Sequence, residues 1–97
     1  MLVIGLDIGT TGTKALVVDE KGTIYGQGYQ EYGLVTAPGG QVTQSAKDWR
    51  NATLHAIQTA VSSVDGSQIA AIGISTQGAS MAVCDRVEDA DLVYTWM

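Results

Sequence analysis

The stretch that decides the fold is LVIGLDIGTTGTKALVVD, which runs from Leu2 to Asp19. Residues 2–8 form a short apolar run that contains β-branched side chains, and residues 13–19 form a second one. The segment 9–12, Gly-Thr-Thr-Gly, separates them with residues typical of tight turns. This pattern predicts a β-hairpin whose turn is rich in glycine and threonine.

The next elements extend this hairpin. A turn signal at residues 19–22 precedes a more exposed strand expected over residues 23–32, which completes a three-strand antiparallel meander. Residues 33–44 hold the one proline of the sequence, Pro38, within a Pro-Gly-Gly cluster, and we expect a loop there. Ser45 then stands three residues before Asp48, a variant of the capping box, and apolar residues recur at helical spacing as far as residue 64. We therefore expect a helix over about 46–64.

A further strand is expected after the helix. The pair Asp65-Gly66 is expected to end the helix, and residues 69–75 form a short, largely apolar run. Such a run is typical of a central strand covered on both faces, here parallel to the first strand. Residues 79–84 and 92–96 suit two more short strands. A meander followed by a helix and a parallel strand is an α/β arrangement, and its chemistry should gather at the carboxyl ends of the strands.

Size and charge restrict the function. The 97 residues suffice for one domain at most, and 45% hydrophobic residues are too many for a disordered tail. Ten acidic against five basic residues give a net charge of −5, which disfavours binding to nucleic acid and to anionic membrane surfaces. No apolar run approaches the ~18 residues of a membrane span, and the start has no basic leader. We expect a cytoplasmic protein without a nucleic-acid or membrane partner.

Several reactive side chains have ordinary interpretations. Cys84 stands alone among apolar residues and suits a small core side chain, and Trp49 suits a core anchor on the helix. His55 has no second histidine or cysteine at ligand spacing, which argues against a metal site. The acidic cluster is interpreted as a solvated loop; it consists of Asp85, Glu88, Asp89 and Asp91.

The densest chemical signal is the segment from Asp7 to Lys14. Glycines and threonines in a hairpin turn can direct backbone amides and hydroxyls at one anion, Lys14 adds positive charge, and Asp7 can hold Mg²⁺ through water. We expect Asp7 to be buried, where it would need a cation or hydrogen-bond donors. A Walker motif is excluded, because two residues instead of four separate Gly9 from Gly12 and a strand-like run follows. An ordinary tight hairpin remains the alternative.

A second polar segment follows the strand over residues 69–75. The side chains of residues 75–80, among them Gln77, can hydrogen-bond a polyhydroxylated ligand, and Gly78 and Ala79 leave room for it. A plain polar turn between strands is the alternative.

Together these segments resemble the amino-terminal part of a carbohydrate kinase of the FGGY family, within the actin-like ATPase superfamily. Three blocks carry the resemblance, in the order found in the family: GLDIGTTGTK (5–14), PGGQVTQSAKDW (38–49) and IGISTQG (72–78). A fourth, weaker match is YTW (residues 94–96). The first block is shared across the superfamily, whereas the middle block is particular to FGGY kinases. The resemblance implies an incomplete ribonuclease-H-like α/β domain over residues 1–97, truncated before a second domain.

The resemblance also implies ATP and Mg²⁺ as cofactors and a small-molecule sugar or polyol as substrate, with a homodimer as a further option. Asp7 would be the catalytic and metal-binding carboxylate. The substrate would contact Gln77, Gly78 and Ala79, and the family's catalytic base is expected beyond residue 97. The phosphate turn would consist of Gly9, Thr10, Thr11, Gly12, Thr13 and Lys14.

Two departures from the family pattern bear on the substrate. Gln77 is followed by Gly78-Ala79, where xylulokinase-like members have Met-His, and Thr43 stands where the glycerol kinase branch has Glu. Our leading hypothesis is a fragment, inactive alone, of a xylulokinase-like enzyme acting on a ketopentose. The alternatives are a non-catalytic actin-like binding or assembly domain and another actin-like phosphotransferase.

Overall fold

The computed structural model describes residues 1–36 and 38–96, and its main sheet begins with the expected meander. Strands β1 (Leu2–Ile8), β2 (Gly12–Asp19) and β3 (Ile24–Glu31) pair in antiparallel order. The turn between β1 and β2 falls on residues 9–11, so the hairpin predicted from the glycine and threonine pattern is confirmed.

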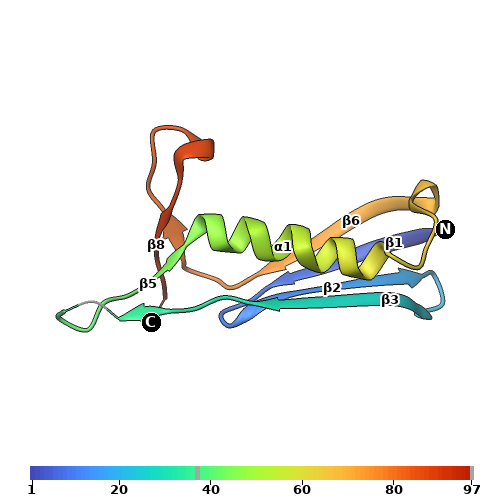
Figure 1. The fold of residues 1–97 in the computed structure, drawn as a ribbon, viewed down its shortest axis with the longest axis horizontal. Helices are drawn as coiled ribbons and strands as arrows, with labels where there is room; N and C mark the ends of the chain where they lie inside the picture. Colours follow the sequence, from blue (N-terminus) through green and yellow to red (C-terminus); the bar gives the residue numbers. More distant parts are fainter. Residues whose placement is uncertain (37, 97) are drawn as a thin grey trace.

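Helix α1 (Ala46–Val61) lies along one face of this sheet (Figure 1). Ser45 is its N-cap and accepts a hydrogen bond from the Asp48 backbone N–H, as the capping pattern predicts. The helix ends three residues earlier than expected, and a short 3₁₀ turn, η1 (Gly66–Gln68), leads into the next strand. The Asp65 carboxylate accepts from the Ser67 N–H and caps the start of η1, so the pair Asp65-Gly66, expected to end the helix, begins the 3₁₀ turn instead.

Strand β6 (Ile69–Thr76) runs parallel to β1, as expected, but it is not central. The strand order is β3-β2-β1-β6, so within the described residues β6 is an edge strand, and Ile72 and Ile74 are more than half exposed. The prediction of a covered, central strand was therefore wrong for the described chain. An apolar run indicates which side chains favour burial, but it does not say how many neighbours the strand has.

A second, small sheet lies beyond the start of α1. Its order is β4-β5-β8-β7, and all its pairings are antiparallel. Residues 33–44 were expected to form a loop, yet they contribute β4 (Val35–Thr36) and the first residues of β5 (Val42–Ser45). The two short strands expected near the acidic cluster are confirmed as β7 (Met81–Ala82) and β8 (Leu92–Tyr94), separated by the 3₁₀ turn η2 (Val87–Asp89).

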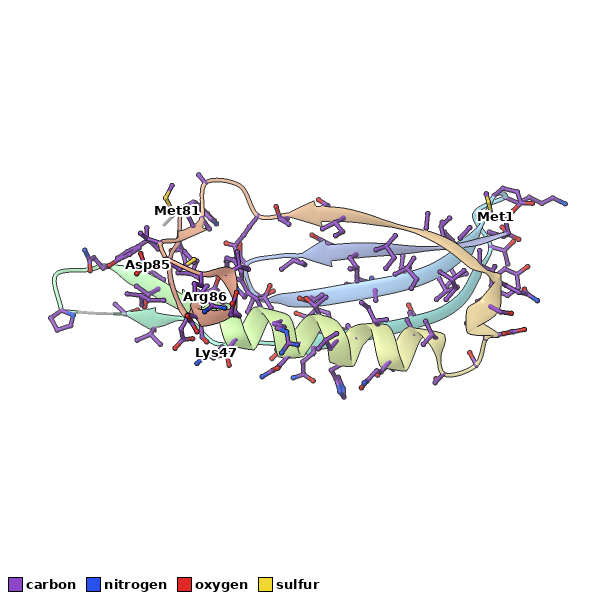
Figure 2. The ribbon with its side chains drawn as sticks, turned by 90° about the horizontal axis from the view of Figure 1, so that it is seen from above. Met1, Lys47, Met81, Asp85 and Arg86 are labelled. Atoms are coloured by element: carbon purple, nitrogen blue, oxygen red, sulfur yellow. The ribbon has the colours of Figure 1, made fainter. Side chains whose placement is uncertain are left out.

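The side-chain view shows how far apart the two ends of the molecule lie. Figure 2 places Met1 at one end and Lys47, Met81, Asp85 and Arg86 together at the other, around the small sheet. The principal-axis extents are 47 × 24 × 20 Å, so the chain is elongated along α1. Sequence-distant segments meet at the second end, because β5 pairs with β8 (Thr43 opposite Tyr94).

The core lies between α1 and the main sheet. Alternate residues of β1 and β2 face the helix, and the helix presents small side chains to them. The buried cluster consists of Leu2, Ile4, Leu6, Ala15, Val17, Ala56 and Ala60. Two of our core expectations fail: Cys84 is exposed, and Trp49 is half-buried outside this cluster.

Cys84 lies outside the core because it belongs to the loop between β7 and β8, and Trp49 lies in the first turn of α1, where its indole contacts Gln44 of the small sheet. Among residues 1–36 and 38–96, no helix has the length and apolar character needed to cross a membrane.

Candidate functional site

Asp7 lies near the carboxyl end of β1, on the face of the sheet opposite α1. Leu6, its neighbour along the strand, is buried against the helix, and strand alternation turns Asp7 to the other side. In register beside it are Lys14 on β2 and Ser75 on β6. Our expectation that Asp7 is buried was wrong: the side chain is exposed, because its face of the sheet is uncovered in the described chain.

The carboxylate of Asp7 is directed at the β1–β2 turn. Its Oδ1 atom would lie 4.0 Å from a Cβ atom placed on Gly9. Within the described part of the chain, no group donates a hydrogen bond to this carboxylate and no cation forms an ion pair with it. An exposed, unpaired carboxylate beside a turn is a suitable ligand for a hydrated divalent cation.

The turn itself offers backbone donors. The Gly9 N–H donates to the Gly12 carbonyl oxygen at 3.0 Å, which closes the turn. No described residue accepts a hydrogen bond from the backbone N–H of Thr10 or Thr11. Successive unpaired N–H groups in a turn form an anion-binding concavity. This arrangement suits a phosphate group placed over the turn, beside Asp7.

Gly12 allows the turn to pack closely on β3. A Cβ atom at this position would lie 2.6 Å from the Tyr29 hydroxyl oxygen and 2.7 Å from the Gln30 carbonyl oxygen. Only a residue without a side chain fits there. The glycine in the motif therefore serves close packing of the turn as well as its conformation.

Thr13 and Lys14 point to opposite faces of the sheet. The Thr13 side chain is fully buried against α1, where its hydroxyl lies 3.3 Å from the Thr53 hydroxyl. Lys14 is exposed on the face that carries Asp7. The structure thus brings Lys14 to the open side of the turn and directs the Thr13 hydroxyl away from it.

Tyr32 holds the turn from the end of β3. Its hydroxyl donates to the Gly9 carbonyl, and its backbone N–H donates to the Thr11 carbonyl at 3.1 Å. Burial raises the pKa of the Tyr32 hydroxyl, and the negative charge of Asp7 adds to the rise. The phenol therefore remains a hydrogen-bond donor to the turn at neutral pH.

Gln77 ties the end of β6 to the same turn. Its backbone N–H donates to the Ile8 carbonyl at 2.9 Å, and its side-chain Nε2 donates to the Gly9 carbonyl at 3.1 Å. Nε2 also donates to Gln44 Oε1 at 2.9 Å. The two segments that the sequence singled out, residues 7–14 and 75–80, thus meet at Gly9.

Gln44 is the residue that sequence reasoning missed. It is 3% exposed, its Nε2 donates to the Thr10 carbonyl at 2.8 Å, and its Oε1 accepts from the Trp49 indole N–H at 3.1 Å. Trp96 adds a weaker contact, because its indole N–H donates to the Thr10 hydroxyl at 3.3 Å. The block 38–49, in which Gln44 and Trp49 stand five residues apart, was the one sequence feature that could have drawn attention to Gln44. Nothing in the sequence indicated its contact with Thr10.

Gly78 and Ala79 continue from Gln77 as an exposed turn. Ala79 has φ 55°, a left-handed conformation that is uncommon for residues other than glycine, asparagine and aspartate. Ser80 then donates to Gln77 Oε1 at 3.2 Å. The segment is an open edge beside the β1–β2 turn, with little side-chain bulk.

The acidic cluster and His55 lie elsewhere. Asp85, Glu88, Asp89 and Asp91 are exposed; Glu88 pairs with Arg86, and Asp91 accepts from the Ser45 hydroxyl at 2.6 Å. His55 is exposed on α1. Among residues 1–36 and 38–96, no three acidic, histidine or cysteine side chains gather as a metal site.

Comparison with known proteins identifies the family of this arrangement. Residues 2–95 match the model of the FGGY family of carbohydrate kinases, N-terminal domain. The chain is 36% identical over 87 residues to a glycerol kinase from Acaryochloris marina, covering 87% of this chain and 17% of the relative. It is 33% identical over 92 residues to a xylulose kinase from Haemophilus influenzae, covering 88% of this chain and 19% of that protein.

A solved structure agrees with the fold. The crystal structure of a xyloylose kinase from Brucella ovis superimposes with a TM-score of 0.86 at 30% identity, covering 99% of this chain and 21% of that one. The chain thus spans about a fifth or less of the length of the proteins that it matches. The expected α/β fold of the actin-like sugar kinases is confirmed.

Proposed function

The chain belongs to the FGGY family of carbohydrate kinases, and we propose that the protein containing it transfers the γ-phosphoryl group of ATP to a hydroxyl of a sugar or polyol. The observation that carries this proposal is the β1–β2 turn, where the backbone N–H groups of Thr10 and Thr11 and the Asp7 carboxylate have no hydrogen-bond partner among residues 1–36 and 38–96. Phosphoryl transfer depends mainly on positioning and on stabilising negative charge, and this turn offers both.

Each residue of the turn has a defined part. Thr10 and Thr11 bind phosphate oxygens through their N–H groups, and Gly9 and Gly12 let the backbone approach them closely. Lys14, in register with Asp7, adds positive charge on the same face. Asp7 fits Mg²⁺ because it is an exposed oxygen ligand without a competing donor among the described residues. When bound there, Mg²⁺ would neutralise charge that develops on the phosphates.

The substrate would lie along the open edge that Gly78 and Ala79 form directly after Gln77. This edge follows β6, whose carboxyl end lies beside that of β1 in the parallel register, so a hydroxyl bound there would approach the phosphate turn. ATP and small sugars are cytoplasmic metabolites, and we place the protein in that compartment.

We propose a ketopentose as the substrate, in line with the relatives named xylulose kinase. The relatives named glycerol kinase make a polyol the second candidate. Thr43 weighs against the polyol: it stands where the resemblance places a polyol-binding glutamate, it is 8% exposed, and its hydroxyl donates to the Val35 carbonyl. A buried, occupied hydroxyl offers little to a polyol.

The experiment is a coupled assay of ADP release by the full-length protein with ketopentoses, hexonates and polyols, in the presence of Mg²⁺. Sugar-dependent ADP release supports the proposal and names the substrate. An Asp7→Asn variant should lose turnover by at least about a hundredfold, because its amide is a weaker magnesium ligand. The control, Asp85→Asn, makes the same change at an exposed carboxylate that has no hydrogen bond to the β1–β2 turn in the described structure. ADP release independent of every sugar, or full activity in Asp7→Asn, would overturn it.

A further inference from the structure

A directed series of hydrogen bonds runs from the end of β8 to the phosphate turn. The Trp96 backbone N–H donates to the Ser80 hydroxyl at 3.2 Å, and that hydroxyl donates to Gln77 Oε1. Gln77 Nε2 donates to Gln44 Oε1, and Gln44 Nε2 donates to the Thr10 carbonyl. We call the four donors, Trp96, Ser80, Gln77 and Gln44, together with Trp49, the amide relay. It joins the small sheet, α1 and the end of β6 to one turn.

The direction of the relay follows from groups that have one hydrogen-bonding role each. The Trp49 indole N–H can only donate, and the Thr10 carbonyl can only accept, so the amide of Gln44 has one allowed orientation. Gln77 must then donate to Gln44 Oε1 and to the Gly9 carbonyl, which uses both hydrogens of its amide. Ser80 in turn must donate to Gln77 Oε1, because an amide oxygen can only accept, and its own oxygen accepts from the Trp96 N–H.

The relay determines what these amides can do at the site. The Gln44 side chain is nearly fully buried. Its Oε1 atom accepts hydrogen bonds from Trp49 and Gln77, and its Nε2 atom donates one to the Thr10 carbonyl. Gln77 Nε2 has no hydrogen left for a substrate hydroxyl. Both side chains therefore fix the carbonyls of Gly9 and Thr10, whose peptide planes set the direction of the free N–H groups in the turn.

We propose that Gln44 and Gln77 are positioning residues for the phosphate turn, and that their N–H groups orient it for the nucleotide instead of binding the sugar. This inference rests on the proposed kinase function. It assigns nucleotide affinity to Gln44, which lies in the small sheet, 34 residues from its partner Thr10 in the sequence. The substrate edge at Gly78 and Ala79 remains outside the relay.

The test is Gln44→Glu in the full-length protein. A carboxylate retains the shape but cannot donate to the Thr10 carbonyl, and its charge repels phosphate. We expect the KM for MgATP and the Kd for MgADP to rise about tenfold or more, while the sugar KM stays within about twofold. The matched control, Gln58→Glu, makes the same change on the exposed side of α1 and should leave all three constants unaltered.

A milder variant keeps the test decisive if Gln44→Glu does not fold. Trp49→Phe removes one donor to Gln44 Oε1 and preserves an aromatic ring. We expect the KM for MgATP to rise about threefold in this variant. A raised sugar KM with an unchanged nucleotide KM in either variant would overturn the proposal. So would a fall in thermal stability with all kinetic constants unchanged.

A measurement without turnover separates this inference from the proposed function. In the peptide that contains residues 8–14, backbone hydrogen exchange should be faster in the Gln44→Glu variant than in the Gln58→Glu variant. This expectation holds whatever the enzyme's substrate is. If the unaltered protein phosphorylates no sugar, the proposed function fails, and the exchange result still decides whether the relay holds the turn. Equal exchange in the two variants would contradict the relay itself.

Discussion

A Cβ atom on Gly28 would lie 2.2 Å from the carbonyl oxygen of Ala56, so strand β3 and helix α1 touch through their backbones. Gly26, two residues earlier on the same face of β3, is in the same position: a Cβ atom there would lie 1.9 Å from the Ala60 carbonyl oxygen. Ala56 and Ala60 are fully buried. The helix can approach the sheet at this distance because both surfaces have little or no side chain.

Gly28→Ala should therefore destabilise the protein by about 2 kcal/mol, since the added methyl group meets backbone atoms of α1 that cannot move alone. Urea unfolding of the full-length protein measures the loss. Gly33→Ala is the control, because a Cβ atom at Gly33 meets nothing within 4 Å in the described structure. Equal stabilities of the two variants would contradict the close contact.

Gly12→Ala should weaken nucleotide binding. The new methyl group would meet the Tyr29 hydroxyl and the Gln30 carbonyl, and the second is backbone, so the turn must shift. We expect the Kd for MgADP to rise by roughly tenfold or more, as the N–H groups of the turn lose their alignment. Calorimetry can measure this, with Gly66→Ala as the control in open space. Retained affinity would show that the turn tolerates the shift.

Ala79→Gly should stabilise the protein by about 1 kcal/mol. Ala79 has φ 55°, where an L-residue with a Cβ atom is strained and glycine is not. The gain is reduced by the greater entropy of glycine in the unfolded chain. A rise in the thermal midpoint would agree with this; a fall would show that the strain is absent. Ala82→Gly, in β7, is a control that should lose stability.

Ser45→Ala should cost about 1 kcal/mol through loss of the N-cap of α1. The change also removes the hydrogen bond to Asp91, which joins the helix start to the strand β8 region. Ser62→Ala, at the other end of the helix, should cost less than about 0.5 kcal/mol. Chemical denaturation compares the two; equal losses would argue that Ser45 does not act as a cap.

The turn between β2 and β3 should make stability depend on pH at both extremes. Hydrogen bonds from the Thr23 and Lys21 backbone and the Tyr25 hydroxyl hold the pKa of Asp19 below its ordinary 3.8. The bond to Asp19 raises the pKa of Tyr25 above its ordinary 10.0. A lowered acid pKa contributes stability above 3.8 that is lost as the pH falls through the folded value. A raised tyrosine pKa contributes stability below 10.0, and this stability is lost as the pH rises through the folded value.

The thermal midpoint of the unaltered protein, minus that of Asp19→Asn, should thus be constant over roughly pH 5 to 9. The difference should shrink below about pH 4 and above about pH 10. A difference that does not vary with pH would contradict the Asp19–Tyr25 hydrogen bond.

Local patterns predicted most of the main sheet. The Gly-Thr-Thr-Gly turn, the capping residue Ser45 and the apolar run after Gly66 each act over a few residues, and the structure confirms the hairpin, the helix start and the parallel strand. The errors concern burial: Asp7 and Cys84 are exposed, and β6 lies at an edge. Burial depends on neighbours that a strand's own residues do not specify.

The candidate site was predicted in part for the same reason. Asp7 and the turn were found because they are consecutive, and Gln77 because it follows an apolar strand. Gln44 and Tyr32 reach the turn only through β5 and β3, and polar residues in a proline- and glycine-rich segment resemble any surface loop. Pairing of β5 with β8 had no periodic signal, since each has four or fewer residues.

The sequence separation between the β1–β2 turn and the relay residues that contact it also determines the order in which these parts are synthesised. The phosphate turn leaves the ribosome early, but Gln77 and Trp96, which contact it, follow 68 and 86 residues behind their partners Gly9 and Thr10. The β1–β2 hairpin can form from local contacts, whereas the turn's final geometry waits for pairings with a high loop-closure cost. A nascent chain would therefore carry a folded hairpin well before the hydrogen bonds that fix the geometry of its turn can form.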